Sequence, residues 1–219
     1  MILARQKIAR SYQERDVALL QMVRMLDEID NVINLLSERA AEWYQVTDPS
    51  FSRKYRSLPA KKMLDMIRRG ADGGLAEVAA EIERLTEVRR RLMREVSAMA
   101  DEVMPNVSAL IGGLVAARLL SRAGGLSELA RMPGSTIQVL GSEQALFSHL
   151  RAGTPPPKHG IIFQHRRVHN APKGVRGRVA RVPSAKLASA ARLDYYRGVL
   201  VPEFVEEAQA RIDAAGGVA

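Results

Sequence analysis

The chain has 219 residues, of which 47% are hydrophobic and 26% charged, and it contains no cysteine. The lack of cysteine excludes a disulfide framework and any zinc or iron–sulfur site held by thiolates. No apolar run approaches the ~20 residues of a membrane-crossing helix, and Arg and Lys interrupt the first ten residues, where a signal peptide needs an apolar stretch. We therefore expect a cytoplasmic protein that contacts no membrane and takes no cofactor.

The positive charge is concentrated in one part of the chain. The formal net charge is +9, yet residues 1–130 are nearly balanced, with 20 basic and 18 acidic side chains. Residues 131–200 carry 12 basic and 2 acidic side chains, and the remainder carries 1 and 4. Between Glu143 and Asp194 there are ten Lys or Arg and all four His, but no carboxylate. This acid-free window, residues 144–193, indicates an anion-binding surface, because a polyanion would supply the missing counter-charge.

Two stretches in the first hundred residues predict long helices that pack as an antiparallel coiled-coil hairpin, because apolar residues recur there at steps of three and four. The two seams are Leu19, Met22, Leu26, Ile29, Ile33, Leu36, Ala40 and Trp43, and then Leu75, Val78, Ile82, Leu85, Leu92, Val96, Met99 and Val103. Arg89 interrupts the second seam. A turn-rich tip over residues 47–57 and a short helix over residues 59–69 are expected between them. Trp43 and Tyr44 near the tip either anchor a partner or pack against the short helix.

Beyond residue 104 the sequence predicts a compact, mainly helical domain. One helix is expected over residues 108–121, where Gly112 and Gly113 allow another backbone to approach closely, and a glycine pair at 124–125 ends it. β-forming residues then predict a short strand, and three consecutive prolines predict an extended loop. The expected elements are a strand over 136–140, a helix over 142–150, a loop over 152–158, a short buried apolar run over 161–163 and a helix over 186–197.

Residues 158–181 are the most informative stretch for function. Basic groups alternate there with Gly and Pro, so that the backbone can approach a ligand closely. Lys and Arg neutralise phosphates and release counterions, and the planar guanidinium of Arg matches the edge of a phosphate. His and Gln can hydrogen-bond with unpaired bases or stack on them. The stretch therefore favours nucleic-acid binding.

Metal binding and catalysis are weaker interpretations of the same residues. His159, His165 and His169 suggest a metal site, but Gly160 and Pro172 disfavour one continuous helix, and no Asp, Glu or Cys lies near them in sequence. A pair of His could act as acid and base in a nuclease. However, the sequence has no phosphate-binding Gly-Lys-Ser/Thr loop and no dinucleotide fingerprint. We therefore predict no metal site and no enzymatic activity.

An ordered series of motifs resembles the Nop domain family, the core proteins of box C/D ribonucleoproteins and their spliceosomal relative. Residues 35–44 also resemble the start of that family's coiled-coil arm. The matching motifs include AARL at 116–119, STIQVLG at 135–141 and PPKHG at 156–160. The others lie at 105–106, 123–126, 129–130, 132–133, 145–147, 162–165, 176–177, 180–181, 185–187, 190–192 and 194.

The resemblance implies an all-α fold, with a long antiparallel coiled-coil hairpin over residues 1–104, a compact, mainly helical Nop-like RNA-binding domain over residues 105–200 and a short acidic tail over residues 201–219. It implies that the protein binds a kink-turn RNA after a ribosomal-protein-like kink-turn binder has occupied that RNA. It also implies a homodimer formed through the arm. The candidate RNA-binding residues are Gln144, Arg151, Lys158, His159, Gln164, His165, Arg166, Arg167, Lys173, Arg176, Arg178 and Arg181.

Three features depart from the family pattern. The archaeal proteins carry an N-terminal domain that recruits the fibrillarin methyltransferase, whereas this sequence begins at the arm, so the resemblance does not extend to fibrillarin as a partner. Residues 141–144 and 145–148 read GSEQ and ALFS in place of GAEK and ALFR, which removes two basic groups. Arg166 follows His165 where a proline is usual.

The sequence thus leaves two functions open. The first is a non-catalytic, RNA-binding component of a ribonucleoprotein, in which the Nop-like domain recognises RNA and the arm serves assembly. The alternative is an interaction adaptor whose coiled-coil arm binds a protein and whose basic domain makes only non-specific contact with nucleic acid. Binding to a kink-turn RNA only in the presence of its primary binder distinguishes the first from the second.

Overall fold

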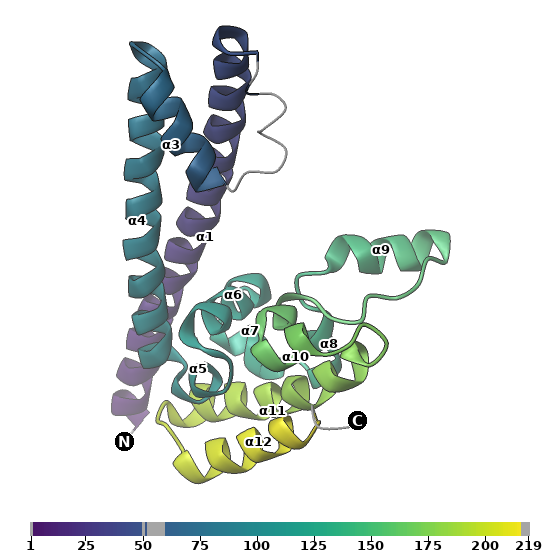
Figure 1. Cartoon of the computed structure of the whole chain (residues 1–219). Coiled ribbons are helices and arrows are strands. Elements are labelled where there is room, and N and C mark those ends of the chain that lie inside the picture. Colours follow the sequence, from purple (N-terminus) through teal and green to yellow (C-terminus); the bar gives the residue numbers. More distant parts are fainter. Residues whose placement is uncertain (1, 50, 52–59, 216–219) are drawn as a thin grey trace. The chain divides into compact units, whose positions relative to one another are not determined.

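The computed structural model describes residues 2–49, 51 and 60–215, and every regular element in this part of the chain is a helix (Figure 1). The expected all-α fold is therefore confirmed. The N-terminal elements are α1 (Ile2–Thr47), α3 (Ala60–Gly70) and α4 (Gly74–Val103). The later ones are α5 (Pro105–Ile111), α6 (Gly113–Ala123), α7 (Leu126–Arg131), α8 (Gly134–Val139), α9 (Glu143–Ala152), the 3₁₀ helix η1 (Ile161–Gln164), α10 (Arg166–Asn170), α11 (Arg176–Arg197) and α12 (Pro202–Ala215).

The chain forms two compact units. The arm unit is Arg24–Met93, and the basic unit comprises the residues up to Val23 together with those from Arg94 onward. Helices α1 and α4 each contribute to both units. None of the helices in the described part of the chain is both long and apolar enough to span a membrane.

The arm unit has a hydrophobic core at the end formed by α3, which confirms the short helix expected there. Tyr44 is buried and meets Phe51 edge-on, with ring centroids 4.8 Å apart. Ile67 of α3 and Ile82 of α4 belong to the same core. Tyr44 therefore packs as a core residue, whereas Trp43 remains 53% exposed. Most of the expected turn-rich tip lies outside the described residues.

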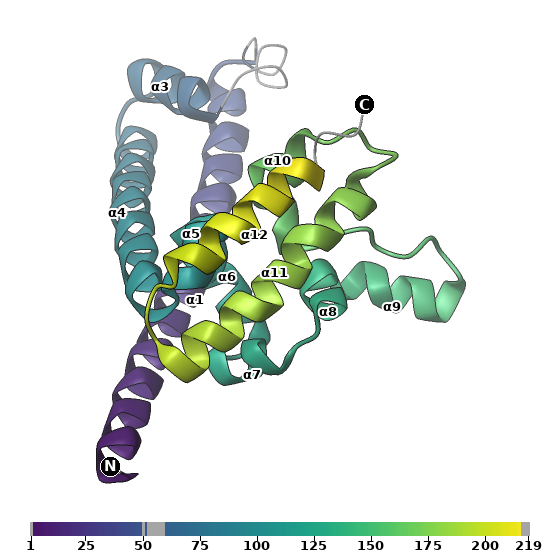
Figure 2. The same ribbon diagram turned by 90° about the horizontal axis from the view of Figure 1, so that it is seen from below.

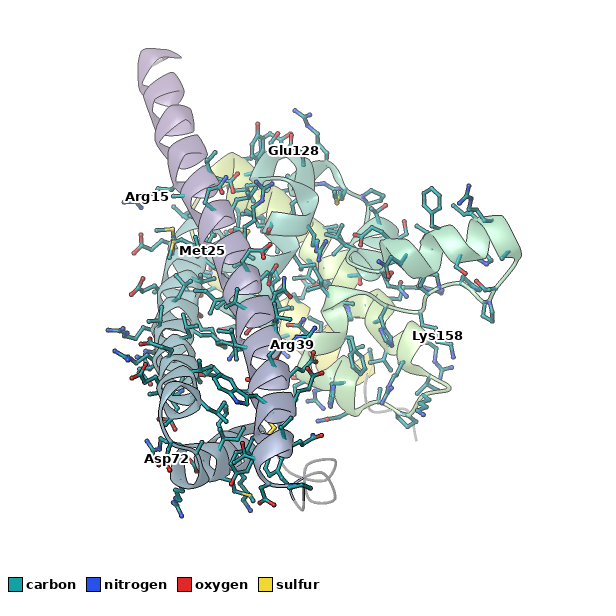
Figure 3. The ribbon with its side chains drawn as sticks, turned by 90° about the horizontal axis from the view of Figure 1, so that it is seen from above. Arg15, Met25, Arg39, Asp72, Glu128 and Lys158 are labelled. Atoms are coloured by element: carbon teal, nitrogen blue, oxygen red, sulfur yellow. The ribbon has the colours of Figure 1, made fainter. Side chains whose placement is uncertain are left out.

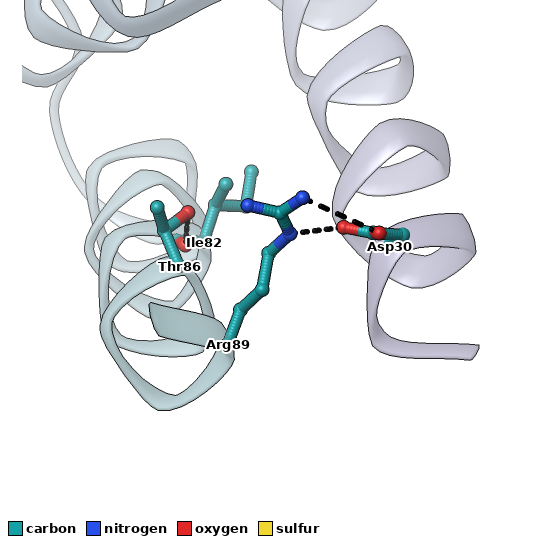
Figure 4. A network of polar contacts seen from close by, with 4 residues as sticks. All are labelled: Asp30, Ile82, Thr86 and Arg89. Atoms are coloured by element: carbon teal, nitrogen blue, oxygen red, sulfur yellow. Dashed lines mark hydrogen bonds and ion pairs between the residues drawn. The ribbon is translucent and has the colours of Figure 1, made fainter. Parts of the chain in front are cut away.

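Arg89, which interrupts the second apolar seam, forms an ion pair with Asp30 of α1 (Figure 4). The Nε and Nη2 of Arg89 both donate to the Asp30 carboxylate, and the Nη2–Oδ2 distance is 3.4 Å. The side chains of Arg89 and Asp30 are each about one-third exposed. One turn earlier, Thr86 donates to the Ile82 carbonyl oxygen at 2.8 Å. The gap in the seam is thus used by a polar contact between the two helices of the hairpin.

Two expectations for the basic unit were wrong. The helix expected over residues 108–121 is divided into α5 and α6 by Gly112, whose φ of +83° is accessible mainly to glycine. Of the expected strand over 136–140, residues 136–139 lie in α8, where Ile137 is fully buried, so packing overrides their β propensity. The close approach expected at Gly113 is confirmed, because a Cβ there would lie 2.4 Å from the Ser97 carbonyl oxygen of α4.

Helix α11 is the central element of the basic unit and packs against α5, α7, α8 and α12 (Figure 2). Its buried side is made of small and aliphatic residues, including Leu187, Ala190 and Ala191. Small side chains let neighbouring helices approach closely and fill the core without large voids. Within the expected acidic tail, Pro202–Ala215 form α12, which runs beside α11 (Figure 2).

A buried polar cluster joins the end of α11 to the start of α5. Asp194 is 2% exposed, and its carboxylate accepts hydrogen bonds from the backbone N–H of Asn106 and of Val107, each at 2.9 Å, and from the Asn106 side chain at 2.7 Å. Asn106 also donates to the Val199 carbonyl oxygen and accepts from the Val201 N–H. Burial raises the pKa of Asp194, and the donated N–H groups act in the opposite direction.

Candidate nucleic-acid interface

The loop that carries Lys158 and His159 is fixed by backbone pairing with the end of α8. The Gly160 N–H donates to the Gln138 carbonyl oxygen, and the Ile161 N–H donates to the Leu140 carbonyl oxygen, each at a distance of 2.8 Å. The pairing leaves no room for a side chain, because a Cβ at Gly160 would lie 1.9 Å from the Leu140 carbonyl oxygen. Of the loop expected over residues 152–158, residues 153–158 lie outside any helix, whereas Ala152 ends α9 and Gly153 is left-handed, with a φ of +65°.

Gln138 connects this loop to the first turn of α11. Its Nε2 donates to the Lys158 carbonyl oxygen at 2.9 Å and to the Gly177 carbonyl oxygen at 3.0 Å. The Lys158 side chain is exposed at the edge of the basic unit, and its Nζ lies 3.4 Å from the Lys173 carbonyl oxygen (Figure 3). The contacts therefore hold the loop backbone in place and leave the charge of Lys158 accessible to a ligand.

Phe163, on η1, is the centre of an aromatic and cationic cluster. His159 stacks on its ring with centroids 4.6 Å apart and planes 15° apart, and the His169 ring lies 4.9 Å away. The guanidinium of Arg176 lies 5.1 Å from the Phe163 centroid, within cation–π range. Arg176 is also held by the carbonyl oxygens of Ala171, at 2.7 Å, and His169, at 3.2 Å. Arg176 is therefore placed by three contacts within the unit, with the Phe163 ring and with the carbonyl oxygens of Ala171 and His169.

The electrostatics of the cluster favour a neutral His159. Burial lowers the pKa of His159, and the nearby Arg176 charge lowers it further. A neutral imidazole keeps one donor and one acceptor nitrogen and a flat apolar face. His159 is thus suited to stacking or hydrogen bonding with a base, while the lysine and arginine side chains around it supply positive charge.

Gln164 is positioned by Arg118, a residue that the sequence reasoning did not select. Arg118 of α6 donates through Nη1 to Gln164 Oε1 at 2.5 Å. This leaves the Gln164 amide NH₂ free to donate elsewhere. Arg118 lies in the AARL motif, but its proximity to Gln164 depends on the packing of α6 against η1. The resemblance to the family was the only sequence signal that marked it.

His165 and Arg167 are less available than their sequence positions indicate. His165 is partly buried, burial lowers its pKa, and its Nδ1 has no hydrogen-bond partner among the described residues. Arg167 pairs with Asp213 of α12, with Nη2 and Oδ1 2.5 Å apart. In a similar contact, Lys186 meets Glu207 of α12 at 3.3 Å. Helix α12 therefore presents carboxylates to two cations of the acid-free window.

The remaining candidates fall into two groups. Arg166, Lys173, Arg178 and Arg181 are exposed on the segments that follow the loop. Gln144 and Arg151 lie instead on α9, which has no buried residue and projects from the rest of the basic unit (Figure 1). Arg151 lies 5.7 Å from the centroid of Phe147, a ring that is 63% exposed. Phe147 and Phe163 are thus aromatic surfaces that a list of basic residues misses.

The three histidines suggested as metal ligands do not converge. His159 and His169 both flank Phe163, whereas His165 faces Arg167 and Asp213. No group of three or more potential ligand side chains gathers within residues 2–49, 51 and 60–215. The surface therefore combines phosphate-binding cations, a neutral stacked histidine and amide donors, which are the groups that recognise irregular RNA.

The chain matches a family model and several known proteins. Residues 66–214 match the Nop family, described as a snoRNA binding domain, fibrillarin. An uncharacterised NOP5 family protein of Methanocaldococcus jannaschii is 35% identical, over 94% of this chain and 59% of that protein. Nucleolar protein 58 of Mycosarcoma maydis is 31% identical, over 88% of this chain and 39% of its own length. The chain thus spans less than two thirds of the length of these relatives.

A solved structure agrees with the sequence matches. The chain resembles a chain in the crystal structure of a fibrillarin/Nop5p complex with a TM-score of 0.64 and 31% identity, covering 98% of this chain and 78% of that one. The motifs noted between residues 105 and 194 lie within the matched residues, and the helical architecture is shared. This chain therefore belongs to the Nop family.

Proposed function

We propose that the chain is a non-catalytic RNA-binding component of a box C/D-type ribonucleoprotein. The observation that supports this most is the loop surface itself. It places the exposed Lys158, the stacked His159 and the Gln164 amide on one part of the basic unit. Its neighbours in sequence include no carboxylate across residues 144–193. The names of the relatives and the description of the family support the same function.

We further infer that the RNA is a kink-turn and that a ribosomal-protein-like primary binder occupies it first. The loop surface offers few base-reading groups, so a composite of RNA and protein would supply the remaining recognition. An intracellular setting fits the name nucleolar protein 58 of the fungal relatives. Scaffolding of fibrillarin is outside the proposal, because the chain spans only part of those relatives.

Titration of a kink-turn RNA with its primary binder tests the proposal. If five to eight cations meet phosphates, log K is expected to fall with log salt at a slope of about −3.5 to −6, using the lower coefficient for irregular RNA. Binding should be much weaker without the primary binder and to a duplex of equal length. A slope near zero rejects RNA binding, and equal affinity for any RNA or DNA supports the adaptor alternative.

We also propose that the arm forms a homodimer. Met25, Val32 and Leu35 are exposed on α1 and are spaced by seven and three residues, which is a heptad register distinct from the buried seam. None of the three side chains belongs to the hydrophobic core of the arm unit, so the exposed stripe is available to a second copy.

Light scattering tests the dimer. The full chain is expected to be dimeric at micromolar concentration, and Val32→Glu with Leu35→Glu is expected to make it monomeric, because charge would be buried unpaired at the interface. Asn34→Glu is the matched control, since Asn34 is exposed on the same helix outside the stripe. A monomeric wild-type chain would refute the dimer and leave the stripe to another protein.

A further inference from the structure

Helix α11 presents an exposed stripe that continues beyond the loop surface. Residues spaced by three or four along a helix share one face. On α11 such a series begins next to the Lys158 loop and reaches the last turn of the helix. It is hereafter the α11 track and comprises Arg178, Arg181, Ala185, Ser189, Arg192 and Tyr196, all exposed except the half-buried Ser189.

No carboxylate of α11 offsets the charge of this track. Asp194 is the only acid on the helix, and it is buried against Asn106 and Val107. Arg192 is held by a hydrogen bond from its Nε to the Ala130 carbonyl oxygen at 3.2 Å, which fixes the side chain and leaves its terminal nitrogens available. Within the described residues, no ion pair involves a cation of the α11 track.

The far end of the track combines aromatic rings with arginine. Tyr196 is 78% exposed, and its ring meets that of Tyr195 at 5.0 Å and 76°. An open groove there is lined by Ser189, Arg192, Leu193, Tyr196, Arg197 and Phe204. Aromatic faces beside guanidinium groups stack on bases and bind phosphates, respectively. The lining contains no carboxylate, so the groove fits an anionic partner.

The track is continuous with the loop surface. Gln138 bridges the carbonyl oxygens of Lys158 and Gly177, so the first turn of α11 begins beside the loop. From Arg178 to Tyr196 the helix rises by ~27 Å, and this is the length of stem that the track can follow. One straight stem could therefore follow the helix from the loop to Tyr196.

We propose that the α11 track is a second contact surface for the same RNA, binding the phosphate backbone of a stem that leaves the loop surface. Arg178, Arg181 and Arg192 contact phosphates, the small side chains of Ala185 and Ser189 let the backbone come close, and Tyr196 stacks on a base at the end of the stem. The proposal rests on the RNA-binding function proposed above and adds how far along the RNA the contact extends.

Two RNAs of different length test the track. Both contain the kink-turn, saturated with its primary binder, and one stem of the longer RNA is extended by about ten base pairs, so that only the longer stem reaches Tyr196. Arg192→Gln combined with Tyr196→Ala is expected to weaken binding of the longer RNA by about five- to twentyfold and to reduce its salt slope by about 1, because one phosphate contact and one stacked base are lost. Binding of the shorter RNA should be unchanged.

Three further variants make the result specific. Arg211→Gln removes the same charge from exposed α12 and should leave both RNAs unaffected. Substitution of Arg192 also removes its hydrogen bond to α7 and so affects packing as well as RNA contact. Tyr196→Ala alone tests the contact without that effect, because Tyr196 is largely exposed. Lys158→Ala should weaken the binding of both RNAs. If only Lys158→Ala weakens binding, the track is rejected and the RNA-binding function stands. If neither Lys158→Ala nor the double variant changes any affinity, both proposals fail.

Discussion

Replacing Asp194 with Ala is expected to lower the free energy of unfolding of the basic unit by about 3 kcal/mol or more. The carboxylate accepts two backbone N–H groups and the Asn106 amide, and each buried donor left without an acceptor costs about 1–3 kcal/mol. The loss would be global, because the cluster joins the start of α5 to the end of α11 and to the following turn. Urea denaturation followed by circular dichroism measures it.

A second substitution at Asp194 separates its hydrogen bonds from its charge, and a substitution on α12 serves as a control. Asp194→Asn keeps one acceptor oxygen and should cost clearly less than Asp194→Ala, whereas Glu206→Ala on the exposed face of α12 should cost almost nothing. If Asp194→Ala and Glu206→Ala unfold at the same urea concentration, the cluster does not stabilise the unit.

Gly160→Ala is expected to weaken RNA binding by about tenfold and to destabilise the basic unit by about 1–3 kcal/mol. Its Cβ would lie 1.9 Å from the Leu140 carbonyl oxygen, which is backbone and cannot move aside, so the loop must shift. The shift would carry Lys158 and His159 away from the positions in which we propose that they face the RNA. Fluorescence anisotropy and thermal unfolding measure the two effects.

Gly174→Ala is the matched control for this substitution. Gly174 lies in the same basic stretch, and a Cβ there would meet nothing within 4 Å. It should change neither the affinity nor the melting temperature. Normal RNA binding by Gly160→Ala would mean that the conformation of the loop does not matter for recognition.

The sequence predicted the hairpin well and the interior of the basic unit less well. Heptad spacing is a local signal, so it located residues that are fully buried, such as Leu26, Ile82 and Val96. The division at Gly112 and the helix at residues 136–140 depend on packing between distant segments. Ile137 is buried in the unit whose centre is α11, and local β propensity contains no information about that contact.

The sequence also indicated where a candidate site lies, but it did not indicate which other side chains its residues contact. Absence of acids along the chain is a local property, and it identified the loop around Lys158. Partners that come from elsewhere could not be inferred. Asp213 reaches Arg167 from α12, and Arg118 reaches Gln164 from α6. Phe163 was predicted only as part of a buried apolar run, because the charge pattern does not indicate that its ring organises the cations around it.

The contacts of α12 carry a consequence for the ion atmosphere of the free protein. Asp213 already pairs with Arg167, and Glu207 already pairs with Lys186. These two cations are therefore not unpaired before a phosphate binds. When RNA arrives, each would exchange an internal anion for an external one, and the displaced carboxylate would then need a cation from solution. Such an exchange releases fewer ions overall than the binding of a phosphate to a cation that has no carboxylate partner in the protein. Helix α12 therefore acts as a built-in counterion, and the affinity for RNA should vary less with salt than the number of basic side chains would imply.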